Sequence, residues 1–270
     1  MTTTISIANK KGGVAKTTTA INVAYSLTRE KLNSNKVLLI DLDSQTNATD
    51  GIGFSTKIKE KLDREGEGIY KILESQLPIT ESDIYNTGYN NLDILPAVPR
   101  LANSEIELLA KEDQRAFLLQ NCLNQNWDYF EDNYDYIIID TNPSIGLLVY
   151  NALVSSDYVL VPVIPDKFAL DGFHQIKDAI ENVNSWGKDV DLLGMVITKV
   201  DKRTTLEDMF RSVLDGVSFT IFDTVISQNV DAQYSQMASR PILEYKPNAK
   251  SGKEYLALTE EIIQKINNNR

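Results

Sequence analysis

The sequence has very little of the residue types that most protein metal and redox sites require. Its 270 residues include one cysteine, Cys122, and one histidine, His174. A single cysteine excludes an internal disulfide framework and a thiolate-rich metal or iron–sulfur site. His174 has no second histidine or cysteine with which to bind a metal, so we expect it to pack against the protein or to lie at its surface.

Two further absences narrow the class of protein. No apolar run approaches the length of a membrane-spanning helix, and the N-terminal residues lack the basic segment and apolar stretch of a secretion signal. The net charge is −11 and the sequence pI is about 4.7. This balance argues against a surface coated with basic residues, although it is compatible with a local basic patch. We therefore expect a cytoplasmic protein with no membrane partner.

Apolar runs that alternate with helical patterns give the fold class. Apolar residues make up 42% of the chain, which is enough for a sizeable core. Buried strands are predicted at residues 5–8, 36–43, 91–97, 134–140, 158–165 and 192–198, with a short strand at 220–225. Helices are predicted at residues 20–27, 103–123, 168–186 and 251–266, and a further helix is predicted to begin at residue 203. A flexible connection is predicted at residues 55–68. This alternation predicts a single α/β domain over residues 1–270, with a doubly wound, mostly parallel sheet and helices on both faces.

A glycine-bearing loop at residues 9–18, Asn-Lys-Lys-Gly-Gly-Val-Ala-Lys-Thr-Thr, joins the first strand to the first helix. Backbone N–H groups and the helix dipole at such a junction favour a bound phosphate. Lys16 would add a positive charge on the phosphates, and the Thr17 hydroxyl would ligate Mg²⁺. The predicted nucleotide-binding residues of the loop are Lys11, Gly12, Gly13, Val14, Ala15, Lys16, Thr17 and Thr18.

The loop departs from the standard pattern G-x-x-x-x-G-K-[ST], because Lys10 and Ala15 stand where glycines are expected. Its K-G-G-x-x-K-T pattern resembles the deviant Walker A loop of the ParA/MinD superfamily of ATPases. The resemblance implies that Lys11 reaches across a dimer to the nucleotide of the partner subunit. Since Ala15 carries a methyl group, its backbone must take a conformation that a residue other than glycine can adopt.

Acidic residues end two of the predicted strands. Asp41 and Asp43 close the second strand, at the edge where open α/β sheets bind ligands. The segment that follows resembles the family pattern D-x-D-P-Q-x-N-A-T, with Ser44 in place of proline. This resemblance implies that Asp43 positions the attacking water and that Asp41 holds the water shell of Mg²⁺. The plainer alternative is that both aspartates cap a loop, because aspartate is common at turns.

Asp140 ends the clearest buried strand of the chain and resembles a Walker B aspartate, which binds Mg²⁺ through water opposite Thr17. The following residues resemble the family pattern D-x-P-P-S-L-G, with Asn142 replacing one proline. In relatives, the residues after the strand at 192–198 touch the adenine. The remaining predicted nucleotide contacts are therefore Thr198 and Lys199, with Pro241 on the closing segment.

The resemblance extends from Ile5 to Ile266 and favours a small ParA-type partition ATPase. It implies ATP and Mg²⁺ as cofactors, slow basal ATP hydrolysis with Lys11, Lys16 and Asp43 as catalytic residues, and a face-to-face homodimer on ATP binding. It also implies non-specific binding to double-stranded DNA, stimulation by a ParB-like adaptor, and association with the nucleoid in the ATP-bound state.

The predicted DNA surface differs from that of many relatives, which carry arginines in the segment matching residues 227–233. Gln228 and Asp231 stand in this segment here. The remaining basic candidates are Lys199, Lys202, Arg203, Arg211, Lys246, Lys250 and Lys253, each of which alone could be an ordinary solvated charge.

Two other functions on the same fold stay open. A MinD-type positioning ATPase needs a basic, amphipathic membrane helix, whereas the predicted C-terminal helix carries Glu254, Glu260 and Glu261. A metabolic ATP-dependent synthetase, similar to dethiobiotin synthetase, would need a pocket for a small carboxylate substrate.

Overall fold

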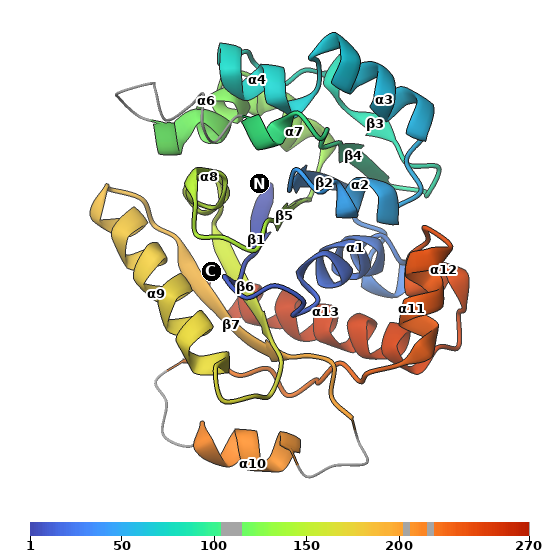
Figure 1. Ribbon diagram of the computed structural model, residues 1–270, viewed down its shortest axis with the longest axis vertical. Coiled ribbons are helices and arrows are strands. Elements are labelled where there is room, and N and C mark those ends of the chain that lie inside the picture. The colour runs from blue at the N-terminus through green and yellow to red at the C-terminus, as the bar shows by residue number, and fades with distance from the viewer. Residues whose placement is uncertain (104–114, 202–205, 215–218, 270) are drawn as a thin grey trace.

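A seven-stranded sheet forms the centre of the computed structural model, which describes residues 1–103, 115–201, 206–214 and 219–269 (Figure 1). The strand order is β3-β4-β2-β5-β1-β6-β7. The strands are β1 (Thr3–Ile7), β2 (Val37–Leu42), β3 (Tyr85–Asn86), β4 (Leu92–Leu95), β5 (Tyr136–Thr141), β6 (Tyr158–Val163) and β7 (Asp191–Ile197). The short edge strand β3 is antiparallel to β4, and the other neighbours are parallel.

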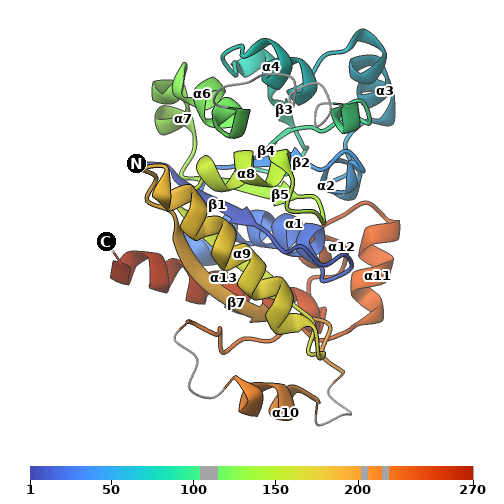
Figure 2. The same cartoon turned by 60° about the vertical axis from the view of Figure 1, so that its left-hand side comes forward.

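Helices flank the sheet on both faces. They are α1 (Lys16–Leu27), α2 (Asn47–Gly51), α3 (Thr56–Glu65), α4 (Ile69–Ser75), α6 (Leu118–Asn124), α7 (Trp127–Asn133), α8 (Leu147–Val154), α9 (Ala169–Ser185), α10 (Leu206–Val213), α11 (Val230–Met237), α12 (Ile242–Tyr245) and α13 (Lys250–Asn269), with short 3-10 turns at Glu30–Leu32, Glu81–Asp83 and Arg115–Phe117. Figures 1 and 2 show α1 and α13 together on one side of the sheet and α8 and α9 on the other.

The central strands are apolar without interruption because both of their faces are covered. Successive residues of a strand point to opposite faces, so Leu39 and Ile138 join the core under α1 and α13. Leu38 and Ile139 point the other way, into the core formed with α4, α6 and α8. Parallel strands sandwiched in this way all end at one edge of the sheet, and this geometry gathers the loops that follow β1, β2 and β5.

The predicted α/β class and parallel sheet are confirmed, and two local predictions are wrong. Residues 56–65 form α3 rather than a flexible connection, because Leu62 packs with Tyr70 and Val98 in a small cluster of their own. Residues 220–225 contribute only an isolated bridge between Met195 and Ile221. The backbone N–H groups of residues 223 and 224 bond to a carboxylate of α13 instead of to a strand.

Three smaller outcomes complete the comparison with the predicted elements. Within the predicted helix at 103–123, residue 103 is helical, residues 104–114 lie outside the described residues, and a 3-10 turn and α6 follow. Cys122 is buried in α6. His174 is exposed on α9, which agrees with the expectation that it packs against the protein or lies at its surface. Among the described residues, no helix combines the length and the apolar character that crossing a membrane requires.

Candidate nucleotide-binding site

The loop between β1 and α1 makes a tight left-handed turn immediately before the helix. Gly13 has φ 75°, and Ala15 has φ 67° and ψ 30°. The Ala15 carbonyl accepts the Thr19 N–H at 2.8 Å and so begins the helix. An alanine can adopt this conformation, as the sequence required, but the left-handed region costs an L-residue about 1–2 kcal/mol. The loop therefore holds a strained residue at the point where the helix N-terminus opens.

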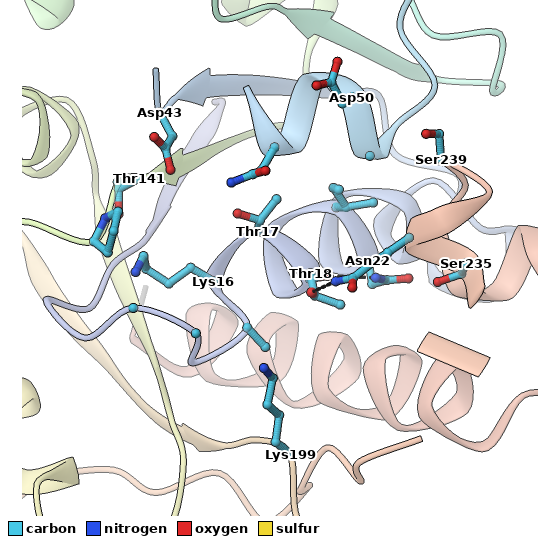
Figure 3. A pocket seen from close by; sticks show the side chains of 18 of the residues that line it. Lys16, Thr17, Thr18, Asn22, Asp43, Asp50, Thr141, Lys199, Ser235 and Ser239 are labelled. Atoms are coloured by element: carbon cyan, nitrogen blue, oxygen red, sulfur yellow. Dashed lines mark hydrogen bonds between the residues drawn. The ribbon is translucent and has the colours of Figure 1, made fainter. Parts of the chain in front are cut away.

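Lys16 lies almost entirely inside this loop. The residue is 7% exposed, and its Nζ donates to the Lys11 carbonyl at 3.1 Å. Burial lowers the pKa of Lys16, while the charges of Asp140 and Asp43 act in the opposite direction. Figure 3 shows the Lys16 side chain pointing toward Asp43 and Thr141 at the ends of the neighbouring strands. The ammonium group therefore lies where the loop and the acidic strand ends converge.

Asp41 and Asp140 are register partners on the adjacent strands β2 and β5. The Asp41 carboxylate is already occupied: one oxygen accepts the Thr49 N–H at 2.8 Å and the Thr49 hydroxyl at 2.7 Å, and the other accepts the Asp43 N–H at 3.1 Å. Burial raises the pKa of Asp41 to about 6. Asp43 is 4% exposed and lines the cavity in front of the loop.

Asp140 is different, because both of its carboxylate oxygens are buried and neither accepts a well-formed hydrogen bond in the described part of the chain, although the nearby Thr17 hydroxyl acts to lower its pKa. Burial, followed by the charge of Asp41, raises the pKa of Asp140 well above its usual value. A buried, unpaired carboxylate is costly and calls for an unseen partner. A hydrated Mg²⁺ fits, because it keeps several waters and needs only one or two protein oxygens besides phosphate. Consistent with this, the described residues contain no cluster of three or more His, Cys, Asp or Glu that could cage a metal alone.

A cavity of about 410 Å³ opens in front of the loop (Figure 3). Of the predicted site residues, Gly12, Gly13, Ala15, Lys16, Thr17, Thr18, Asp43 and Lys199 line it. Val14 and Pro241 are buried. Pro241 follows the lining residues Ser239 and Arg240 and immediately precedes α12.

Thr198 lies behind the loop and supports it. It is completely buried, and its hydroxyl donates to the carbonyls of Val14 and Val163, at 3.0 Å each. The bond to Val14 joins the end of β7 to the back of the phosphate loop. The position of Thr198 therefore favours a role in holding the loop, rather than the predicted contact with adenine.

The far wall of the cavity comes partly from Ser239 and Arg240, which lie in the closing segment that the sequence indicated. The rest comes from residues that the sequence did not single out: Asn22, Asp50, Ser235 and Gln236. Gln236 of α11 donates to the Thr18 hydroxyl at 2.6 Å, and Asn22 accepts the Ile242 N–H at 2.8 Å. These contacts join segments more than 200 residues apart, for which no local pattern in the sequence gives a signal.

Two of the predicted DNA-binding residues already have intramolecular partners. Arg211 contacts Glu207 at 3.2 Å and the carbonyls of Phe222 and Asp223 at 3.3 and 3.0 Å. Lys246 contacts both carboxylate oxygens of Asp231 at 3.0 Å. Lys199, Lys250 and Lys253 are exposed, whereas Lys202 and Arg203 lie outside the described residues.

Comparison with known sequences assigns the family. A family model described as "AAA domain" matches residues 2–192. The chain is 36% identical over 260 residues to the sporulation initiation inhibitor protein Soj of Bacillus subtilis, covering 96% of this chain and 97% of that protein. It is 35% identical over 263 residues to the chromosome partitioning protein ParA of Myxococcus xanthus, covering 97% and 88%. The chain belongs to the ParA/Soj family of partition ATPases.

Solved structures agree with this assignment and show how widely the fold is used. A plasmid partition protein of Borrelia burgdorferi bound to AMPPNP matches with a TM-score of 0.74 and 29% identity, over 100% of both chains. Cobyrinic acid a,c-diamide synthase of Mycobacterium smegmatis with bound ADP and magnesium matches with a TM-score of 0.80 and 27% identity, covering 100% of this chain and 97% of that chain. This ParA/Soj-family chain therefore shares its fold with both a partition protein and a biosynthetic enzyme.

Proposed function

We propose that this ParA/Soj-family chain binds and hydrolyses ATP with Mg²⁺ and acts as a nucleotide switch in DNA partition. The observation that carries the proposal is the meeting of Lys16, Thr17 and Asp43 at one cavity, beside the unpaired carboxylate of Asp140. Two proteins of similar structure hold ligands of the proposed kind, AMPPNP in one and ADP with magnesium in the other. Lys11 and the other loop residues predicted from the sequence would complete the nucleotide contacts.

The roles of the residues follow from their positions. Thr17 and Asp140 would hold Mg²⁺, with Asp41 behind them, and the ion would offset charge on the β- and γ-phosphates. Lys16 supplies positive charge from the chain itself, and its burial strengthens that interaction because little water screens it. Asp43 lines the cavity, and its backbone N–H donates to Asp41; we assign to it the orientation of the attacking water.

We further propose that ATP pairs two subunits face to face, that Lys11 then serves the partner's nucleotide, and that the pair binds DNA without sequence preference. A ParB-like adaptor would stimulate slow basal turnover, and DNA binding would localise the ATP-bound protein to the nucleoid. The exposed Lys199, Lys250 and Lys253 support contacts to phosphate, while Lys246 is neutralised by Asp231. Binding should weaken steeply with salt, because phosphate contacts release counterions.

The likeness to cobyrinic acid a,c-diamide synthase favours one alternative, an ATP-dependent synthetase. The higher identity to Soj and ParA, over almost the whole chain, supports partition instead. The two are separated by what stimulates ATP turnover: DNA with an adaptor for partition, or a small carboxylate substrate with an amide donor for a synthetase.

The membrane-positioning alternative has less support. In α13, the apolar residues Tyr255, Leu258, Ile262 and Ile266 are buried in the core that includes α1. A helix whose apolar face is already covered has little surface left for a bilayer.

Two substitutions in the loop test the switch. Lys16→Ala should abolish nucleotide binding, because it removes the buried ammonium that we assign to the phosphates. Lys11→Ala should leave nucleotide binding intact but block ATP-dependent pairing. Nucleotide affinity would be measured by displacement of a fluorescent ADP analogue, and pairing by light scattering. A mass that still doubles with ATP in Lys11→Ala would reject the role of Lys11 in the pair.

A further inference from the structure

Lys11 is tied at two points to the segment that runs from β6 to α9. Its ammonium forms an ion pair with Asp166, which lies between these two elements. Its backbone N–H donates at 2.9 Å to the side-chain oxygen of Asn9, whose amide nitrogen donates at 2.7 Å to the Pro162 carbonyl. Figure 2 shows the beginning of α9 next to the loop that follows β1. The position of Lys11 therefore depends on a part of the chain about 150 residues away.

The Asp166 carboxylate is itself oriented. One oxygen accepts the Phe168 N–H at 2.9 Å, and the other meets the Lys11 ammonium. Burial alone would raise the pKa of Asp166, but the contact with Lys11 and the bond from Phe168 together lower it. Asp166 is therefore ionised at neutral pH and aimed at Lys11 before any nucleotide arrives.

Asn9 has little freedom to move. A Cβ atom added to Gly172 of α9 would lie 2.8 Å from the Asn9 side-chain oxygen, which is closer than real Cβ atoms approach. The helix therefore packs directly against the amide that holds the Lys11 backbone, and glycine is the residue that permits this approach.

We propose that Asp166 is a positioning residue that holds Lys11 against its own subunit and thereby sets the concentration at which ATP pairs two subunits. The inference rests on the proposed function, in which Lys11 serves the nucleotide of a partner. Pairing then has to replace the contact between Lys11 and Asp166 with a contact to the partner's phosphates. Asp166 would therefore oppose premature pairing.

The expected size of the effect follows from exposure. The side chains of Lys11 and Asp166 are 32% and 34% exposed, so water screens the ion pair. Breaking one such pair should change the dimerisation equilibrium by a factor of only about 1.4 to 5. Because a dimer breaks two such pairs, removing the Asp166 charge should lower the protein concentration for half-dimerisation by about two- to twenty-five-fold.

The first test uses Asp166→Asn, which keeps an oxygen for the Phe168 N–H but removes the charge. Dimerisation with AMPPNP and Mg²⁺ would be measured by light scattering across a range of protein concentrations. Asp171→Asn is the matched control, because Asp171 is exposed in the first turn of the same helix. A shift to lower concentration in Asp166→Asn alone supports the proposal. An unchanged or higher concentration overturns it, as does an equal shift in the control.

The second test needs no nucleotide and separates this inference from the proposed function. The rate at which an amine reagent labels Lys11 would be compared by mass spectrometry with that of the exposed Lys57. Labelling of Lys11 should rise severalfold in Asp166→Asn and stay low in Asp166→Glu, which retains the charge. No rise overturns the role of Asp166. If labelling rises as expected but the unaltered protein never pairs with AMPPNP, the proposed dimer fails, and with it the control of pairing by Asp166.

Discussion

The hydroxyl of Thr198 offers a sharp test of how the phosphate loop is held. Thr198→Val keeps the shape of the side chain but removes the donor to the carbonyls of Val14 and Val163. Val163 keeps a partner, because its carbonyl also accepts the Thr198 N–H at 2.7 Å. Val14 loses this donor, and leaving a buried carbonyl unpaired costs about 1–3 kcal/mol.

The free energy of unfolding should therefore fall by about 1–2 kcal/mol, measured by urea denaturation without nucleotide. Because the lost bond acts on the loop, the affinity for ATP and for inorganic triphosphate should fall together, by up to about tenfold. Both affinities would be measured by displacement of a fluorescent ADP analogue. Thr198→Ser should restore them, since it keeps the hydroxyl.

The matched control is Thr259→Val in α13, where an equally buried hydroxyl donates at 2.7 Å to the Tyr255 carbonyl. This variant should change stability without changing nucleotide affinity. The reasoning would be refuted if Thr198→Val weakened ATP while leaving triphosphate binding intact. That result would mean that Thr198 contacts the adenine, as the family resemblance implies, and does not act through the loop.

Two further predictions concern the loop backbone and the buried acids. Ala15→Gly should raise the free energy of unfolding by up to about 1 kcal/mol, because relief of the left-handed strain outweighs the greater freedom of glycine in the unfolded chain. An unchanged or lower urea denaturation midpoint would contradict the strain argument. Since burial raises the pKa of Asp41 to about 6, the folded state binds a proton more tightly than the unfolded chain. In EDTA, the contribution of Asp41 to the free energy of unfolding should therefore be full below about pH 4 and be lost as the pH rises through 6. This loss should shrink in Asp41→Asn. An identical pH profile in that variant would show that Asp41 does not contribute.

The parts of the site that the sequence predicted are those whose geometry is local. The strained turn, Lys16 and Thr17 lie within a few residues of one another, between a strand and a helix that hydrophobic periodicity identifies. Asp43 and Asp140 could be placed beside the turn because parallel strands bring their carboxyl ends to one edge of the sheet. Chain direction placed these residues at one edge of the sheet, and the resemblance to the ParA/MinD superfamily gave their expected roles.

The parts that the sequence did not predict depend on packing between distant segments. Gln236 reaches Thr18, and Asp166 reaches Lys11, only because α11 and α9 pack beside the loop. The α3 helix was missed for a related reason: its charged sequence reads as solvent-exposed, and Leu62 is the buried residue that anchors it. Such contacts are set by tertiary packing, which overrides local propensity.

The charges around the cavity favour a divalent cation beside the proposed nucleotide. Asp41, Asp43 and Asp140 are each less than 5% exposed, and the one buried ammonium facing them is that of Lys16 among the described residues. A triphosphate brings further negative charge to this edge, where burial makes repulsion much stronger than in water. The pKa of Asp140 is raised well above its usual value, which shows that the charge of this carboxylate is already costly before a nucleotide binds. A cation between Asp140 and the phosphates removes both costs at once, so nucleotide and Mg²⁺ are expected to bind as a unit, with neither tightly held alone.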